Sequence, residues 1–245
     1  MSSIEAYDDR ERIKKYDADM EVMHPNRGKM AEVALDFLAA FKEAPSQVLD
    51  LGCGSGFVAE RLLDRFANVQ INCLDGAQNI LDLAAMRLKS HADHLTYTCS
   101  DFRTLNTLPL KEKSFDAVMS SYALHHLSAD EKVQVLRDCL DLLKPGGFFL
   151  NADLIKNPSP AFECCIQDLR VKGILQRAAP DDDRFASKEG TQAYLTKMES
   201  AEGDQPLDIE EDLALFRRAG FFPVSVLWLE YREAVICAQK PALQD

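Results

Sequence analysis

Short apolar runs alternate with longer segments that carry an apolar residue every three to four positions along the first 155 residues. The short runs are typical of buried strands, and the longer segments are typical of amphipathic helices. In the segment 57–66, for example, Val58, Leu62 and Phe66 fall on one helical face. This alternation predicts strand–helix–strand units, which form a parallel sheet with helices on both faces. The expected strands are 47–51, 69–74, 95–99, 115–120 and 147–153.

The pattern changes after residue 156. Residues 157–206 are mostly helical in character, beginning at Ser159-Pro160, a favourable helix start. A further helix is expected from Asp208 to Gly220, and two strands follow it. Because only three residues separate these strands, they can pair as an antiparallel hairpin. The expected strands are 224–229 and 233–238. The whole chain is thus expected to have four segments: an N-terminal helical lid (1–45), an α/β core (46–156), a helical substrate-binding insertion (157–206) and a closing helix with two strands (207–245).

Charge narrows the range of partners. The 245 residues include 28 Lys and Arg against 40 Asp and Glu, a formal net charge of −12. Such a chain repels a phosphate backbone at long range, so nucleic acid is not the favoured partner. No apolar run approaches the roughly 20 residues of a membrane-spanning helix. The first 15 residues are charged where a signal peptide would be apolar, so we expect a cytoplasmic protein. We also expect a monomer or homodimer that makes no membrane contact.

Cysteine and histidine positions do not indicate a metal or a disulfide framework. The seven cysteines are scattered and form no C-x-x-C pair. His91, Asp93 and His94 lie close together, but no other ligand-rich segment accompanies them, and a polar helix end explains them. The sequence therefore predicts no metal site.

The most informative segment is 48–56, Val-Leu-Asp-Leu-Gly-Cys-Gly-Ser-Gly. An apolar strand ends here in three alternating glycines before a helix begins, which lets the backbone turn tightly and approach a ligand. A dinucleotide fingerprint has the spacing G-x-G-x-x-G, whereas Gly52, Gly54 and Gly56 give G-x-G-x-G behind the acidic Asp50. A carboxylate at this point repels phosphate and attracts an amino group or another cation. The spacing therefore disfavours a nicotinamide-dependent dehydrogenase.

Acidic residues also close the next two strands. Asp75 follows the second strand, 23 residues after Gly52, where a carboxylate can accept both hydroxyls of a ribose. Asp101 and Phe102 follow the third strand and offer an acceptor and a ring for an adenine. The carboxyl edges of the three strands together indicate an adenosine that carries a positive group and no phosphate.

With these motifs in place, the sequence resembles the class I S-adenosylmethionine-dependent methyltransferases of small molecules. Four separated motifs carry the resemblance, over about residues 48–153, and the segment 215–221 extends it weakly. The motifs are residues 48–56, Leu74-Asp75, Ser100-Asp101-Phe102, and 115–127 followed by Leu142-Leu143-Lys144-Pro145-Gly146-Gly147. The resemblance implies a Rossmann-like fold with a seven-stranded, mostly parallel sheet, an antiparallel edge hairpin, helices on both faces and a helical insertion before the last two strands.

The resemblance also implies a cofactor, S-adenosylmethionine, and residues that hold it. Asp50, Gly52 and Gly54 would hold the methionine end, Asp75 the ribose, and Asp101 with Phe102 the adenine. Arg27, in the expected lid, is a candidate partner of the cofactor carboxylate, and Tyr7, Tyr16, Met20 and Met23 are candidate lid contacts. The expected cofactor-binding residues are Asp50, Gly52, Cys53, Gly54, Asp75, Gly76, Asp101, Phe102, Ser120 and Arg27.

The expected reaction is in-line transfer of the methyl group to an O, N or C atom of a small-molecule acceptor, which needs mainly alignment and desolvation. Tyr122, His125 and His126 follow the fourth strand, beside the transferred methyl group in the resembling family. A histidine there either deprotonates the acceptor or shapes the pocket. Three alternatives remain: methylation of a protein or RNA, modification of the cofactor into a carboxylated analogue, and a non-catalytic partner subunit that keeps the cofactor fold.

Overall fold

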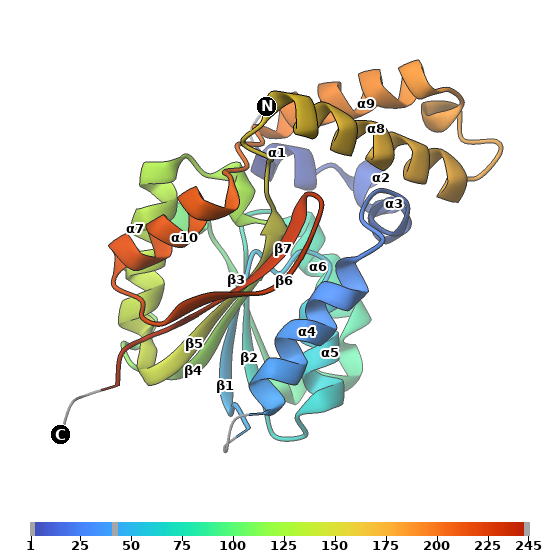
Figure 1. Ribbon diagram of the computed structural model, residues 1–245. Helices are drawn as coiled ribbons and strands as arrows, with labels where there is room; N and C mark the ends of the chain where they lie inside the picture. Colours follow the sequence, from blue (N-terminus) through green and yellow to red (C-terminus); the bar gives the residue numbers. More distant parts are fainter. Residues whose placement is uncertain (1–2, 41–43, 243–245) are drawn as a thin grey trace.

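A computed structural model describes residues 3–40 and 44–242. Its centre is a seven-stranded sheet in the order β3-β2-β1-β4-β5-β7-β6 (Figure 1). The first five strands are parallel, and β7 pairs antiparallel with β5 and β6. This is the expected fold, including the edge hairpin. The strands are β1 (Gln47–Leu51), β2 (Gln70–Asp75), β3 (Leu95–Cys99), β4 (Phe115–Ser121), β5 (Leu143–Leu154), β6 (Val224–Glu230) and β7 (Glu233–Gln239).

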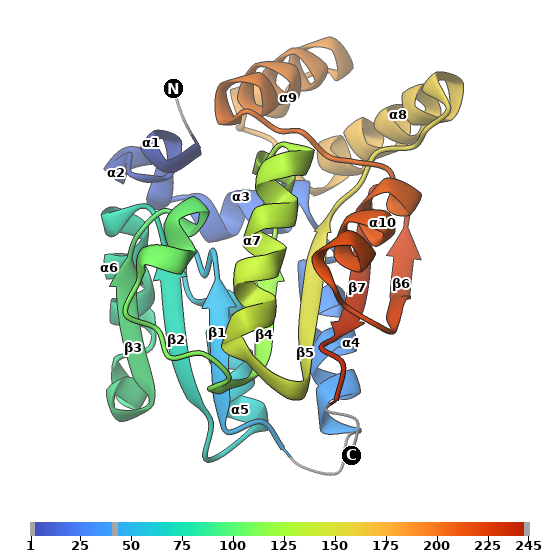
Figure 2. The ribbon, with the colours of Figure 1, turned by 90° about the vertical axis from the view of Figure 1, so that its left-hand side faces the viewer.

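Helices cover both faces of the sheet. On one face, α4 packs beside α5 and against β5, β6 and β7, and residues such as Leu35 of α4 and Leu62 of α5 belong to one buried apolar cluster. On the other, Leu136 of α7 and Phe216 of α10 pack against β4 and β5 (Figure 2). Each helix buries one apolar stripe, which is why the alternating pattern is visible in the sequence. These helices are α4 (Arg27–Ala39), α5 (Phe57–Arg65), α6 (Gln78–Arg87), α7 (Ala129–Leu142) and α10 (Ile209–Ala219), with the short 3-10 helices η1 (Lys89–His94), η2 (Phe102–Thr107) and η3 (Leu124–His126).

A helical cap lies above the carboxyl ends of the parallel strands (Figures 1 and 2). The first three helices and the insertion contribute to it, and they pack together through a small core that includes Met23, Val171 and Leu195. The cap contains α1 (Ser3–Tyr7), α2 (Arg10–Ile13), α3 (Tyr16–Met23), α8 (Pro160–Arg177), η4 (Asp183–Phe185) and α9 (Lys188–Glu202).

The segment expected to be a lid, 1–45, has two parts in the described range. The helices α1 to α3 belong to the cap, whereas α4 packs on the sheet through the buried Met30, Ala34 and Leu38. The strand β5 begins at Leu143, four residues before the expected start at 147. β5 pairs with β4 first at Leu143 and again from Phe148, and a register shift separates the two pairings. The residues between them, including Pro145, are part of the strand.

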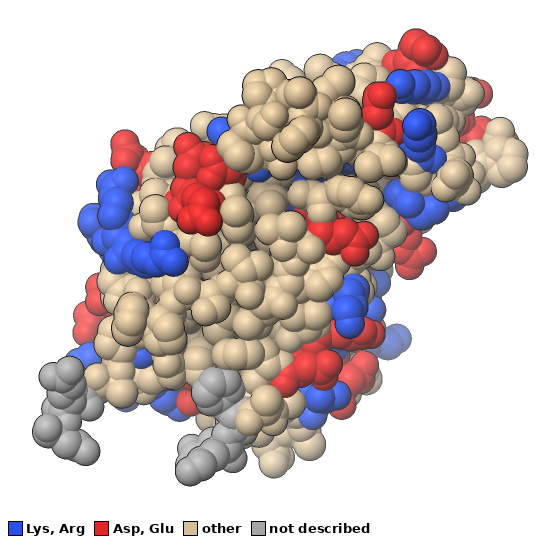
Figure 3. Space-filling view, viewed as in Figure 1, with Lys and Arg blue, Asp and Glu red and all other residues tan. Residues whose placement is uncertain are grey.

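The outer strand β6 presents an apolar surface. Phe222, Val226, Leu229 and Tyr231 are exposed in and around it. In the view of Figure 3, Lys, Arg, Asp and Glu gather mainly at the margins of the molecule, and the middle of this face is mostly uncharged.

No helix in the described part of the chain is both long enough and apolar enough to cross a bilayer.

Candidate functional site

The turn after β1 opens a cavity at the point where the strand order reverses. Gly52 and Gly54 both have left-handed backbone conformations, with φ of 71° and 53°. The amides of Gly52 and Cys53 donate to the carbonyl of Leu74, at 2.8 and 3.0 Å, which ties the turn to β2. A Cβ atom on Gly52 would lie 2.5 Å from the Cβ of Ala123. Only glycine therefore leaves space between this turn and the segment after β4.

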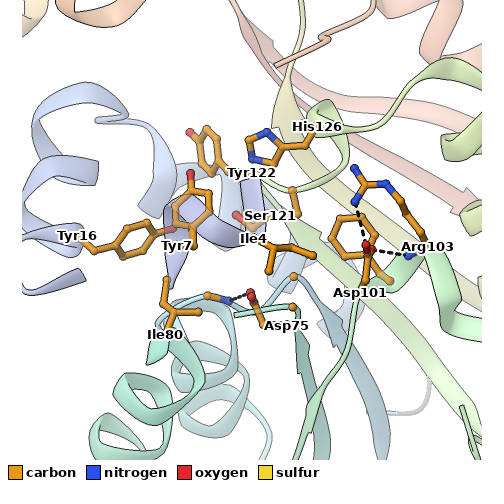
Figure 4. Close-up of a pocket in the computed structure, with 15 residues that line it drawn as sticks. Ile4, Tyr7, Tyr16, Asp75, Ile80, Asp101, Arg103, Ser121, Tyr122 and His126 are labelled. Atoms are coloured by element: carbon orange, nitrogen blue, oxygen red, sulfur yellow. Dashed lines mark hydrogen bonds and ion pairs between the residues drawn. The ribbon is translucent and has the colours of Figure 1, made fainter. Parts of the chain in front are cut away.

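The first cavity, of about 540 Å³ including its mouth, lies above this turn (Figure 4). Crevices outside the carboxyl ends of strands at a reversal of strand order are the usual ligand sites of open α/β sheets. Six expected cofactor-binding residues and two expected catalytic ones line this cavity. They are Gly52, Gly54, Asp75, Gly76, Asp101 and Phe102, with Tyr122 and His126.

Asp75 is positioned by backbone donors. Its Oδ2 accepts from the amide of Gly54 at 2.9 Å, and its Oδ1 accepts from the amide of Ala77 at 3.0 Å. Burial raises the pKa of this carboxyl above its ordinary value, although the backbone hydrogen bonds oppose the shift. Each oxygen retains a further lone pair, so the carboxylate can accept hydroxyl groups from a ligand in the cavity.

Asp101 caps the short helix after β3. Its carboxylate accepts from the amide of Arg103 at 2.9 Å and pairs with the Arg103 guanidinium at 3.1 Å (Figure 4). Arg103 itself lines the cavity and was not expected from the sequence.

Asp50 lies behind the glycine turn and has no exposed surface. Neither carboxylate oxygen has a hydrogen bond of ordinary geometry among the described residues. Burial raises its pKa to about 7, the nearby charge of Asp75 adds to the shift, and the Ala59 amide and Arg27 oppose it. Asp50 does not line the cavity, contrary to the expectation that it contacts a ligand directly. Its carboxyl group lies behind the turn.

Three other expected cofactor residues also lie outside the cavity wall. The Cys53 side chain is buried in the core beneath the turn, and the Ser120 hydroxyl donates to the carbonyl of Leu51 at 2.9 Å. Arg27 is buried, pairs with Asp17 at 3.0 Å and lies over the ring of Phe57. In this structure the Arg27 guanidinium is paired within the protein and does not line the first cavity, so its expected contact with a cofactor carboxylate stays a prediction. Ser121, the neighbour of Ser120, lines the cavity instead.

The N-terminal helices form one wall of the first cavity. Ile4, Tyr7 and Tyr16 line it from above (Figure 4). The Tyr7 hydroxyl donates to Glu202, at the end of α9, at 2.8 Å. Arg12 also pairs with Glu202, so α1 and α2 are joined to the insertion. The aromatic character of the N-terminal segment was the sequence signal for Tyr7 and Tyr16, whereas nothing marked Ile4.

A second cavity adjoins the first, and Tyr7, Tyr16 and Tyr122 line both. The second cavity lies between α3, the segment after β4 and the insertion. Its lining is rich in methionine and tyrosine. The remaining lining residues are Arg12, Asp19, Met20, Met23, His24, His125, Leu154, Arg170, Tyr194, Met198, Glu202 and Asp204.

His125 is held by Asp153, at the end of β5. The Nδ1 of His125 lies 2.6 Å from Asp153 Oδ1, and the His125 amide donates to the other carboxylate oxygen at 3.0 Å. Burial opposes the charged imidazole, but the charge and hydrogen bond of Asp153 outweigh it and raise the pKa of His125 above its ordinary value. The same pair lowers the pKa of Asp153 against the effect of burial. The sequence placed His125 near the site but did not identify its partner.

His126 and Tyr122 have different surroundings. His126 is 7% exposed, and burial together with the neighbouring His125 lowers its pKa. Tyr122 has a φ of 50°, which is uncommon for a bulky residue and is typical of functional sites. Its hydroxyl donates to Glu233 at 2.6 Å, and burial with that carboxylate raises its pKa well above the ordinary value. Tyr122 therefore stays protonated and presents its ring to both cavities.

Comparison with known proteins agrees with this architecture. The family model described as "Methyltransferase domain" matches residues 48–147. An uncharacterized methyltransferase of Geobacillus sp. (strain WCH70) is 30% identical over 159 residues, which are 64% of this chain and 68% of that protein. Another, from Anoxybacillus flavithermus (strain DSM 21510 / WK1), is 30% identical over 131 residues, 54% of this chain and 58% of that protein. Alignments with the first relatives span about half of their length.

The fold is also found in a solved structure of an O-methyltransferase family protein from Burkholderia thailandensis. The TM-score is 0.68 at 17% identity, and the match covers 99% of this chain and 64% of that chain. The glycine turn and the acidic strand ends lie within the matched residues 48–147, and the fold as a whole is the one shared with the solved structure. This chain belongs to the class I S-adenosylmethionine-dependent methyltransferases.

Proposed function

We propose that the first cavity binds S-adenosylmethionine and that the protein transfers its methyl group to a small molecule in the second cavity. One observation carries the proposal. The cavity above the glycine turn shares three lining tyrosines with a second cavity that the insertion borders. A donor site and an acceptor site that meet at one wall are what an in-line transfer requires.

The residues of the first cavity fit this cofactor. Asp75 offers carboxylate oxygens for the ribose hydroxyls, and Asp101 with Phe102 offers an acceptor and a ring for the adenine. The left-handed Gly52 and Gly54 leave the space that a methionine end needs. Asp50 is buried behind the turn, and its oxygens have no hydrogen bond of ordinary geometry among the described residues. A cationic ligand in the cavity would favour the ionised form of this carboxyl, whereas a phosphate would oppose it.

The cofactor supplies an activated methyl group. In the transfer, the bond from sulfur to methyl breaks, the bond from methyl to the acceptor atom forms, and the electron pair stays on sulfur. An acceptor that carried a proton releases it. His125 and His126 lie where the two cavities meet, and we assign them to contact and orient the acceptor atom, with the Tyr122 ring as the dividing wall. Alignment and exclusion of water supply most of the acceleration.

The enclosure of the second cavity favours a small acceptor over a protein or RNA. Helices α3, α8 and α9 surround it, and its lining contains Met20, Met23, Met198 and Tyr194. Because the lining also contains Arg12, Asp19 and Arg170, this surface suits a small molecule that carries both an apolar or aromatic part and polar groups. Conversion of the cofactor into a carboxylated analogue needs a cation for the added carboxylate, but Arg12 is paired with Glu202 and Arg27 with Asp17.

The cysteines agree with a location in the cytoplasm. All seven are free, and three are exposed, which suits a reducing compartment.

Calorimetric titration tests the cofactor assignment. We expect S-adenosylmethionine and its demethylated product S-adenosylhomocysteine to bind, and NAD not to bind. Replacement Asp75→Ala removes charge-assisted hydrogen bonds of about 1.5–3 kcal/mol each before water compensates, so affinity should fall at least about tenfold. The matched control Asp93→Ala removes an exposed carboxylate far from the cavity and should bind as the wild type does. Equal affinity in the Asp75 variant would remove the ribose assignment.

If NAD binds and neither S-adenosylmethionine nor S-adenosylhomocysteine does, the methyltransferase proposal is overturned as a whole. A protein that binds S-adenosylmethionine, yet transfers no methyl group from radiolabelled cofactor to any compound of a small-molecule acceptor panel, would favour the non-catalytic partner subunit.

A further inference from the structure

Three potential metal ligands meet between the two cavities. His125 and His126 come from η3, after β4, and Asp204 comes from the segment that follows α9. One ligand atom from each lies within 4.8 Å of the other two. Because His126 lines the first cavity while His125 and Asp204 line the second, the cluster sits at their junction.

The chain places Asp204 here by a specific device. Gly203 ends α9 in the left-handed conformation, with φ of 73°, and turns the chain toward η3. The amide of Gln205 then donates to the carbonyl of His125 at 2.7 Å. This hydrogen bond fixes Asp204 beside the histidine pair.

Several polar atoms of this cluster lack a hydrogen bond of ordinary geometry. His126 is buried, and among the described residues its Nε2 has no hydrogen-bond partner, while its Nδ1 meets only Asp204 Oδ1, at 3.0 Å and without the geometry of a hydrogen bond. The Asp153 carboxylate accepts from Nδ1 of His125, which directs Nε2 of that ring toward Asp204 Oδ1, 3.7 Å away. A carboxylate that orients a histidine through its other nitrogen is the usual outer support of a metal ligand.

The spacing of the ligand atoms fits a tetrahedral ion. Bonds of about 2.0–2.1 Å place neighbouring ligand atoms of such a site about 3.3 Å apart. Here Asp204 Oδ1 lies 3.0 Å from Nδ1 of His126 and 3.7 Å from Nε2 of His125. Small rotations of the side chains would bring both distances to that value.

We propose that His125, His126 and Asp204 bind a divalent transition-metal ion. Two imidazoles and one carboxylate suit Zn²⁺ and its neighbours, whereas Mg²⁺ and Ca²⁺ favour all-oxygen sites. Three protein ligands leave one position open, and the cavities adjoin it. An ion there would hold and polarise an oxygen or nitrogen of the acceptor. That role rests on the proposed function, whereas binding of the ion does not.

The sequence predicted no metal because the two adjacent histidines were not connected with an aspartate 78 positions later. The segment that was weighed, around His91 and His94, forms no such cluster in the described chain. His94 Nδ1 contacts the carbonyl of Val69 at 3.0 Å instead.

The test uses Co²⁺, whose visible absorption reports coordination. The adjacent exposed thiols of Cys164 and Cys165 would also bind it, so all proteins carry Cys164→Ser and Cys165→Ser. We expect one Co²⁺ per chain, a visible band without thiolate charge transfer, and its displacement by Zn²⁺. In Asp204→Asn and His126→Gln the affinity should fall at least 100-fold. In Asp153→Asn, which removes only the outer support, it should fall about 10- to 100-fold.

The matched control is the double variant His91→Gln/Asp93→Asn, which should bind as the parent does. S-adenosylhomocysteine affinity, measured on Asp204→Asn and Asp153→Asn, verifies the fold and tests the cofactor site separately. Because His126 lines the first cavity, the fold of His126→Gln is verified by circular dichroism and urea unfolding instead. No Co²⁺ binding by the parent would overturn the metal site, and so would binding that survives Asp204→Asn and His126→Gln.

Discussion

Asp50 makes the stability of the cofactor-free protein depend on pH in an unusual direction. Its pKa in the folded protein is about 7, against an ordinary value of 3.8. Between these values the unfolded chain has released the proton while the folded chain retains it. The unfolded state therefore binds fewer protons, and the free energy of unfolding falls as pH rises through this window. The replacement Asp50→Asn removes this dependence.

The magnitude follows from the two pKa values. A shift of about three units corresponds to roughly 4 kcal/mol that is lost once pH exceeds the folded pKa, and about 1.7 kcal/mol of it is already lost at pH 5. Asp50 should therefore lower the free energy of unfolding by about 2–3 kcal/mol between pH 5 and pH 8. Any cost of the buried asparagine amide is the same at both pH values and cancels from the comparison.

Urea unfolding of the wild type and of Asp50→Asn, both without cofactor, measures this effect at pH 5 and pH 8. The difference in unfolding free energy should shift by about 2–3 kcal/mol in favour of the variant at the higher pH. Asp93→Asn, at an exposed position, should keep the pH dependence of the wild type. An equal difference at both pH values would refute the reasoning, because it would mean that Asp50 ionises in the folded protein as it does in water.

Two further substitutions test the turn and the buried ion pair. Gly52→Ala should abolish cofactor binding, measured by calorimetry, because the added Cβ meets Ala123. The control Gly146→Ala also has a left-handed backbone, with φ of 81°, but no atom lies within 4 Å of the added Cβ. It should lose only about 1–2 kcal/mol of stability and bind the cofactor normally. Equal binding by both would contradict the steric argument. Lys132→Met leaves Asp212 buried without its 2.8 Å partner and should cost about 3–5 kcal/mol in urea unfolding. The double variant Lys132→Met/Asp212→Leu should recover most of that loss, and a double variant as unstable as the single one would show that packing, and not charge, is responsible.

The sequence predicts the sheet well because the central strands are buried on both faces and read as continuous apolar runs. The glycine turn is equally visible, since the left-handed Gly52 and Gly54 have few substitutes. Both signals are local. The closing hairpin was predicted for the same reason, because three residues between two strands allow few other connections.

Side-chain partners between distant segments were not predictable in this way. Arg27 carries a charge suited to a cofactor carboxylate, but its pairing with Asp17 depends on how α3 lies against α4. The partner of His125 is Asp153, 28 residues later in the sequence and at the end of β5. The topology predicts which strand ends lie side by side. Whether Ser120 or Ser121 lines the cavity depends on which face of the pleated strand each side chain takes, and the sequence does not show this.

The insertion does more than border the second cavity. Glu202, at its end, receives Tyr7 and Arg12 from the N-terminal helices, and two residues later Asp204 faces the histidine pair. The segment 202–205 thus joins the wall of the first cavity to the junction of both. A substitution that displaces this segment, such as Gly203→Val at a left-handed position, should therefore weaken cofactor binding and metal binding together. Asp204→Asn should weaken only the metal, because the Tyr7 and Arg12 contacts to Glu202 remain. The contrast between these two variants, measured with S-adenosylhomocysteine and Co²⁺, separates the contribution of the segment's backbone from that of its single carboxylate.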